Sequence, residues 1–302
     1  MFILILIILG IINPTEDPIT LNPNLYTGAY RYSLPQEALN KMLEGTFFFF
    51  FSYTDQEKEQ INADINALYA KVMAVNPPHV KEAVITAGAP GSGKTTLINK
   101  LKGNYAYICP DDVALPALTG YQADKSDLTQ AYTKWRAASN AANHLILGNL
   151  IKNGTAFCFG TTCASDKTHL FFKHLKDQRY RIKVIHVIAP DDVRVASIKE
   201  RDKLVVQTKD EDIRQKGKDV PKRINDTFLA HADEIAFYYR GCVDEQAVHT
   251  ATWTKDRKLT IIDQTKYGQM KAIHNAAVTA ADLQWEDAVE KNSETIIFPA
   301  AL

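Results

Sequence analysis

The chain has 302 residues, of which 46% are hydrophobic and 23% are charged. This composition predicts a folded protein with one large α/β domain or two small ones, and it excludes an intrinsically disordered chain. Its 35 basic residues balance its 35 acidic residues; because nucleic-acid binders usually carry a basic excess, this balance disfavours a nucleic-acid partner.

The N-terminal segment, residues 1–80, shows no nucleotide chemistry. Phe2–Ile12 is almost wholly apolar, but it is shorter than the roughly 20 residues that span a bilayer. It also lacks the basic flank and the cleavage site of an export signal. A core element, an atypical export signal and a surface-docking peptide all stay open for it. We expect a cytoplasmic protein, with secretion and membrane contact of the N-terminus left open.

Two further features precede residue 80. Five consecutive phenylalanines, Phe47–Phe51, cannot share one face of a helix or strand, so we expect other elements to cover them, with a partner-binding surface as the alternative. An amphipathic helix is predicted to follow, with Thr54 as its N-cap and Glu57 completing a capping box. The sequence Asn76–Pro78 ends this helix.

From Lys81 onward, short β-rich runs alternate with longer helical patterns. The strands are expected at 82–87, 105–109, 156–159, 182–189 and 259–263, and the helices at 95–102, 126–153, 167–177 and 191–202. This alternation predicts an α/β fold, a P-loop NTPase core with a parallel sheet and helices on both faces. We assign 1–80 to an N-terminal extension, 81–265 to the core with a lid near 199–224, and 266–302 to a helical tail.

A phosphate-binding loop follows the first predicted strand. Residues 88–95, GAPGSGKT, fit G-x-x-x-x-G-K-[ST] at every position, with a strand before them and a helix after them. Glycines let backbone N–H groups converge on phosphate oxygens, and the helix N-terminus adds its partial positive charge. Lys94 is expected to reach the β- and γ-phosphates and Thr95 to offer its hydroxyl to Mg²⁺. The predicted ATP-binding residues are Gly88, Ala89, Pro90, Gly91, Ser92, Gly93, Lys94, Thr95 and Thr96.

Acidic residues follow the second predicted strand, in Pro110-Asp111-Asp112. Ligands of open parallel sheets bind at the carboxyl ends of the strands, so Asp111 is a candidate general base and a candidate Mg²⁺ ligand. The alternative interpretation is that the two carboxylates only cap the next helix.

The region 199–224 is dense in charge of both signs and is punctuated by Gly217 and Pro221. It is typical of a lid that closes over phosphates, and a solvated pair of charged helices is the alternative. Further along, Tyr238, Tyr239 and Arg240 are candidates for the substrate side. The basic residues that could neutralise the transition state are Arg201, Arg214, Lys218 and Arg223.

Taken in order, five elements of the sequence resemble the zeta-toxin family of P-loop small-molecule kinases. They are GAPGSGKT, YICPDDVALPAL, NLIKNGTAFCFGTT, LKDQRYRIKVIHVIAPDDVRVASIKER and KGKDVPKRIND, within about residues 80–250. The resemblance implies ATP-dependent phosphorylation of a hydroxyl, in known members often that of a UDP-linked amino sugar. It implies that Asp111 is the base, that Lys94 and Thr95 hold phosphate and Mg²⁺, and that Arg201 contacts the transferring phosphate. An antitoxin-like inhibitor, or a host protein, is the protein partner to consider.

The sequence departs from the family pattern at three positions. Lys218 stands where the family has an arginine in its Gly-Arg-x-Val-Pro element, and lysine cannot form the bidentate fork. Phe159 replaces a glutamate before Gly-Thr that helps hold the sugar, and Cys163 replaces an arginine shortly after it. Kinase chemistry could survive these changes with a different acceptor, and a nucleotide sugar stays open as the small-molecule substrate.

Two other functions compete with a small-molecule kinase. The first is an NTP hydrolase or switch that signals to a protein, although no water-positioning glutamine or switch loop is evident. The second is a nucleoside, polynucleotide or RNA kinase, of which the charge balance disfavours the polymer substrates. The eight histidines and the four cysteines show no metal-site spacing, and we expect the cysteines to be buried.

Overall fold

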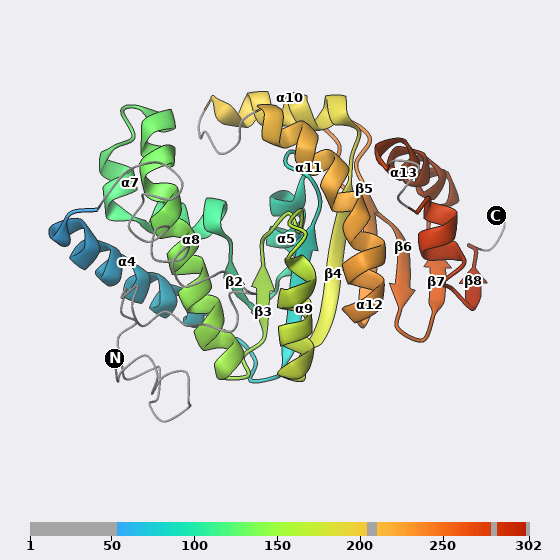
Figure 1. Ribbon diagram of the computed structural model, residues 1–302, viewed down its shortest axis with the longest axis horizontal. Helices are drawn as coiled ribbons and strands as arrows, with labels where there is room; N and C mark the ends of the chain where they lie inside the picture. Colours follow the sequence, from blue (N-terminus) through green and yellow to red (C-terminus); the bar gives the residue numbers. More distant parts are fainter. Residues whose placement is uncertain (1–52, 204–209, 279–282, 300–302) are drawn as a thin grey trace. The chain divides into compact units, whose positions relative to one another are not determined.

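The computed structural model describes residues 53–203, 210–278 and 283–299 (Figure 1), so Phe2–Ile12 and Phe47–Phe51 lie outside the described residues. Contacts divide the chain into two compact units, and each is considered by itself. The first contains Met1–Lys81 and Asn104–Cys158, and the second contains Glu82–Gly103 and Phe159–Leu302. The predicted boundaries at 80 and 265 stay predictions.

The first unit is mainly helical. Helix α4 (Asp55–Met73) begins at the predicted capping box, in which Thr54 and Glu57 each accept a backbone N–H from the other. The long helix α8 (Leu128–Lys152) begins at Asp127, whose carboxylate accepts two N–H groups of the first turn. The ring of Tyr53 stacks on Trp135 of α8, with 5.4 Å between the ring centroids.

Two short strands, β2 (Ala106–Ile108) and β3 (Phe157–Phe159), are neighbours in the strand order. Both strands fall within the runs predicted at 105–109 and 156–159. After β2 the chain turns through a one-turn π-helix, η3 (Pro110–Ala114), and two short helices, α6 (Leu115–Ala117) and α7 (Thr119–Ala123). Asp64 of α4 fixes the start of α7, because its carboxylate accepts the Thr119 backbone N–H at 2.7 Å.

The second unit is built on a mixed sheet with the strand order β1-β4-β5-β6-β7-β8. Strand β1 pairs in parallel with β4 and β4 with β5, whereas β6 is antiparallel to both β5 and β7 (Figure 1). Strand β8 pairs in parallel with β7. The strands are β1 (Glu82–Ala87), β4 (Arg181–Ile188), β5 (Glu234–Tyr239), β6 (Val248–Thr254), β7 (Lys258–Ile261) and β8 (Thr295–Ile297).

In chain order, helices connect most of the strands of this sheet. Those that follow a predicted pattern are α5 (Lys94–Leu101), α9 (Thr168–Asp177), α10 (Asp191–Asp202) and α13 (Gln264–Ala277). The others are α11 (Asp210–Arg223), η4 (Ile224–Phe228), α12 (Leu229–His231) and η5 (Glu286–Glu290). Within the described ranges no helix combines the length and the apolarity that a membrane span requires.

The α/β class of a P-loop core is confirmed, and the sheet is mostly parallel. Strands β1 and β4 fall on predicted runs, because buried parallel strands read as continuous apolar stretches. Strand β7 also overlaps a predicted run, although it pairs antiparallel with β6. Strands β5, β6 and β8 were not predicted. Strand β6 makes the sheet mixed rather than purely parallel, since it returns antiparallel beside β5 after a short connection.

Aromatic side chains in successive contact lie in the core of the second unit. Phe172 packs on Phe228, whose ring centroid lies 5.8 Å from that of His186. His186 in turn meets Phe237 edge-on at 6.0 Å, and Phe237 meets Trp285 at 4.9 Å. The imidazole therefore packs against aromatic rings and is only 1% exposed, which disfavours its charged form. Burial lowers the pKa of His186 to about 3, and repulsion from two nearby cationic groups acts in the same direction.

Because His186 is buried in its neutral form, we expect the folded protein to lose stability in acid. His186 takes up a proton near pH 6.5 in the unfolded chain but only near pH 3 in the folded chain. The stability that the neutral His186 allows is therefore complete above about pH 6.5 and is lost as the pH falls toward 3. In this window His186 should lower the free energy of unfolding by about 1.4 kcal/mol per pH unit. Urea unfolding of wild type and His186→Phe between pH 7 and pH 4 checks this. Between pH 7 and pH 4 the variant should lose less free energy of unfolding than wild type. Equal losses would contradict the low pKa of His186.

Candidate functional site

The connection between β1 and α5 is shaped by three glycines with positive φ. Gly88 has φ 141°, Gly91 has φ 80° and Gly93, the N-cap of α5, has φ 94°. Residues with a Cβ rarely adopt these angles. Because Gly93 has no side chain to cap the helix, the N–H groups of the first turn of α5 have no side-chain cap. This arrangement is the anion-binding geometry that the sequence predicts.

The same loop is pressed closely against its neighbours. A Cβ on Gly88 would lie 2.4 Å from the carbonyl oxygen of Val187 in β4, and one on Gly91 would lie 2.3 Å from that of Arg194 in α10. Both distances are shorter than real Cβ contacts, and both neighbours are backbone atoms that cannot rotate away. The loop therefore keeps its shape through direct backbone contact with β4 and α10.

Two side chains of the loop point back onto the loop itself. Lys94 Nζ donates to the Ala89 carbonyl oxygen at 2.9 Å. Ser92 is fully buried, and its hydroxyl has no hydrogen-bond partner within the described residues. A buried hydroxyl without a partner is unfavourable, so the loop carries a local cost at Ser92.

The Gly-Thr segment after β3 is fastened to the end of β1. Thr86 Oγ1 donates to the Thr161 carbonyl and accepts the Thr161 N–H, both at 2.9 Å, and Gly88 N donates to Thr162 O at 3.1 Å. Cys163 follows with φ 55°, and its thiol donates to the Thr86 carbonyl at 3.4 Å. Burial raises the pKa of Cys163 to about 12, against the pull of two nearby cationic side chains, so the thiol stays neutral.

Arg194 of α10 is a site residue that the sequence analysis did not identify. Its side chain is almost fully buried, although it carries a charge. It pairs with Asp191 and donates Nη1 to the Ile213 carbonyl of α11 at 3.1 Å. A Cβ on Gly217 would lie 2.3 Å from its Nη2. Arg194 thus joins α10 to α11 beside the phosphate loop, and only the three-dimensional arrangement reveals it.

Arg240, predicted only as a candidate for the substrate side, lies at the end of β5 and braces the loop. Its Nη1 donates to the Gly91 carbonyl at 3.0 Å and its Nε to the Glu245 carbonyl at 2.9 Å, while Nη2 donates to the Val243 carbonyl. All three parts of the guanidinium group therefore bind backbone oxygens. The residue fixes the position of the phosphate loop against the segment after β5.

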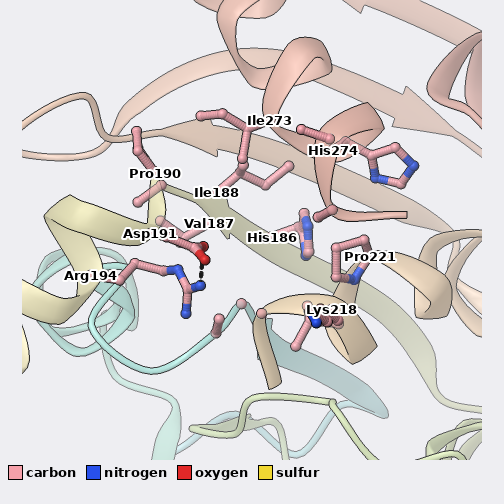
Figure 2. A pocket seen from close by; sticks show the side chains of 17 residues that line it. His186, Val187, Ile188, Pro190, Asp191, Arg194, Lys218, Pro221, Ile273 and His274 are labelled. Carbon is pink, nitrogen blue, oxygen red and sulfur yellow. Dashed lines mark hydrogen bonds and ion pairs between the residues drawn. The ribbon is translucent and has the colours of Figure 1, made fainter. Parts of the chain in front are cut away.

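A cavity of about 340 Å³ opens beside the start of the loop (Figure 2). Gly88 and Ala89 line it together with Lys218 of α11, so the structure brings these three predicted residues together. Arg201 does not line this cavity; it donates Nη2 to the neighbouring Asp202 at 3.1 Å.

The remaining basic candidates of the predicted lid, which contains α11 and the end of α10, lie elsewhere. Arg214 is exposed. Arg223 is buried and pairs with Asp226 at 3.0 Å.

Asp111 belongs to the first unit, where it lies in the first turn of η3. The N-cap of that turn is Cys109, without a side-chain cap, so neither acid occupies the N-cap position. The Cys109 thiol donates to Asp112 at 3.5 Å. Burial, followed by repulsion from Asp112 and Asp111, raises the pKa of Cys109. The role of Asp111 as general base stays a prediction.

The expected burial of the cysteines holds for three of the four. Cys109, Cys158 and Cys163 are buried free thiols, whereas Cys242 is exposed. The prediction was wrong for Cys242 because it lies in the turn that follows β5, not in a strand or directly after a buried one.

Comparison with known proteins places the phosphate loop within a known family. A family model described as Zeta toxin matches residues 66–265, which is more than half of the chain. The chain belongs to the zeta-toxin family. The match contains the phosphate loop, Asp111 and the whole region of α10 and α11. A comparison with curated protein sequences finds no match.

Solved structures with a similar fold include two of the AvrRxo1-ORF1:AvrRxo1-ORF2 complex. The native complex is 11% identical, covering 86% of this chain and 90% of that chain with a TM-score of 0.55. The complex with ATP is 10% identical, covering 87% and 95% with a TM-score of 0.54. A structure from the PezAT toxin–antitoxin system of Streptococcus pneumoniae is 18% identical, covering 65% and 81% with a TM-score of 0.49. At these identities the likeness to the two AvrRxo1-ORF1:AvrRxo1-ORF2 structures shows a shared fold.

The packing of the loop predicts opposite effects for two glycine substitutions. Gly91→Ala should lower the free energy of unfolding by about 2 kcal/mol or more, because φ is positive and the Arg194 backbone blocks a Cβ. The control, Gly268→Ala in α13, has nothing within 4 Å and should raise it by about 1 kcal/mol or less. Chemical unfolding measures both, and a neutral Gly91→Ala would refute the close contact.

Proposed function

We propose that this zeta-toxin family protein is a kinase that transfers the γ-phosphoryl group of ATP to a hydroxyl of a small molecule. The observation that carries the proposal is the phosphate loop, in which three glycines with positive φ lead into the N-terminus of α5. Backbone amides converging at a helix N-terminus are suited to a phosphate chain. The similar fold of the AvrRxo1-ORF1:AvrRxo1-ORF2 complex with ATP supports ATP as the donor.

Lys94 and Thr95 would carry the electrostatic part of the reaction. In the structure the Lys94 ammonium is held by the Ala89 carbonyl, within the loop where the phosphates would bind. An incoming phosphate oxygen would replace that carbonyl and place the charge at the β- and γ-phosphates. Thr95, in the first turn of α5, supplies a hydroxyl oxygen, the kind of donor that Mg²⁺ prefers. Mg²⁺ would neutralise phosphate charge, and Asp111 is its second proposed ligand.

A smaller cavity is suited to the nucleoside part of the donor. It has a volume of about 200 Å³ and lies between the first turns of α5 and the segment after β5. Gly93, Thr96 and Lys100 line one side of it, and Arg240 with residues 243–247 lines the other. Because Gly93 ends the phosphate loop, a nucleotide whose phosphates occupy the loop would extend directly into this space.

Asp111 is proposed as the base that removes the proton of the attacking hydroxyl, and Arg201 and Lys218 as cations that stabilise the transferring phosphate. Lys218 is supported by its place on the cavity that Gly88 and Ala89 also line. Arg201 would have to leave Asp202 to act.

The acceptor is proposed to differ from a UDP-linked amino sugar. Phe159 is buried and packs edge-on to Phe171 at 5.6 Å, and Cys163 is a buried neutral thiol. Neither can replace the charged residue of the family pattern at its position, and the glutamate that Phe159 replaces is the one that helps hold the sugar. A protein inhibitor is part of the proposal, supported by the complex of the similar AvrRxo1-ORF1 with a second chain.

A labelled-phosphate experiment with a matched pair of variants tests this function. Wild type should move label from γ-labelled ATP to small molecules of a metabolite extract. Asp111→Asn should still bind ATP but transfer at least about 100-fold more slowly, as expected for loss of a general base, whereas Asp112→Asn should remain close to wild type.

Two outcomes would contradict the proposal in different ways. Label appearing only as inorganic phosphate would favour the hydrolase or switch, and label on RNA or nucleosides would favour those kinases. Normal transfer by Asp111→Asn would leave the kinase in place and remove Asp111 as its base.

A further inference from the structure

The 340 Å³ cavity has the size and lining of a small-molecule pocket. Its floor is the end of β4, and its sides are α10, α11 and α13 (Figure 2). Pockets that hold small ligands are commonly a few hundred Å³ in volume, mostly apolar, with a few polar groups. Here the lining is mostly apolar, with charged side chains from α10 and α11 and with His274 from α13. The apolar wall residues that matter below are Ile188, Val220, Pro221, Ile273 and Ala277.

His186 gives this apolar cavity a polar group at its floor. Its side chain is 1% exposed, and in the described part of the chain its Nδ1 has no hydrogen-bond partner. Phe228 and Phe237 hold the ring in place at 5.8 and 6.0 Å. A buried imidazole nitrogen without a partner is unfavourable by about 1–3 kcal/mol. Since burial lowers the pKa of His186 to about 3, the ring is neutral and offers one donor and one acceptor.

Positive charge lies at the side of the cavity. Arg194 is committed to Asp191 and to the Ile213 carbonyl. Lys218 is exposed and has no ion pair within residues 53–203, 210–278 and 283–299. The cation of this cavity without such partners is Lys218, the residue also proposed to act on the transferring phosphate, and it favours an anionic substituent.

We propose that this cavity is a second small-molecule site, which binds a flat heteroaromatic ring that carries an anionic group. The ring would lie between α11 and α13 and exchange a hydrogen bond with His186, and its anionic group would face Lys218. The site is separate from the proposed donor site, because the two cavities have no lining residue in common. Gly88 and Ala89 belong to the phosphate loop, so a ligand in this cavity would lie against the loop.

Two probes and one pair of variants test the site. Indole-3-acetate and indole share a flat ring with an N–H and differ by the carboxylate, and calorimetry or ligand-observed NMR measures their binding. Ala277→Trp should fill the cavity and weaken both probes at least about tenfold. The control, Ala272→Trp, places the same side chain at an exposed position of α13 outside the cavity and should bind like wild type.

Two further variants separate the chemical parts of the proposal. His186→Phe keeps a ring but removes the nitrogens, and should weaken both probes about tenfold, the value of one hydrogen bond. Lys218→Met should remove the preference for indole-3-acetate over indole and leave indole binding unchanged. These variants keep the test decisive if Ala277→Trp does not fold.

Binding of the probes to the second site can be tested separately from the proposed kinase activity. A non-hydrolysable ATP analogue should bind to Ala277→Trp as to wild type, and both probes should still bind when the analogue is present. Failure of the ATP analogue to bind would remove the proposed function and leave the second site standing. The proposal is overturned if neither probe binds wild type, if Ala277→Trp and Ala272→Trp behave alike, or if the ATP analogue displaces both probes.

Discussion

The site depends on how closely the backbone of the phosphate loop approaches β4 and α10. Gly88 lies against the Val187 carbonyl and Gly91 against the Arg194 backbone, with no space for a Cβ at either position. This contact fixes the loop from outside, and the Arg240 guanidinium fixes it at the Gly91 carbonyl. The loop is therefore held in its phosphate-binding shape by the surrounding protein. Such preorganisation is what makes electrostatic stabilisation of a charged transition state effective.

The same contacts connect the loop to the region that was predicted as a lid. Arg194 contacts the loop with its backbone and α11 with its guanidinium group, while Gly217 packs against that group. Lys218 follows Gly217 directly and lines the cavity beside Gly88. One buried arginine thus contacts both the phosphate loop and α11. Removing a partner from a buried charge is strongly unfavourable, which is why Arg194 cannot easily exchange its contacts.

Sequence reasoning succeeded where local pattern determines structure. The strand at 82–87 and the capping box of Thr54 and Glu57 agree with the structure, because a buried run and a cap are short-range features. Strand β6 was missed, since its alternation of polar and apolar residues is typical of an antiparallel strand, and a parallel pattern was expected. Arg194 and Arg240 gave no local signal of their structural roles, because their partners lie 19 and up to 149 residues away. The apolar lining of the larger cavity comes from separate elements for the same reason.

The most direct test of the account is a crystal structure of the protein with a non-hydrolysable ATP analogue and Mg²⁺. The account predicts that the β-phosphate lies inside the loop of residues 88–95 and accepts its backbone N–H groups. It further predicts that Lys94 Nζ leaves the Ala89 carbonyl, which it contacts at 2.9 Å without nucleotide, for a phosphate oxygen. An analogue bound elsewhere, with Lys94 still on Ala89, would contradict it.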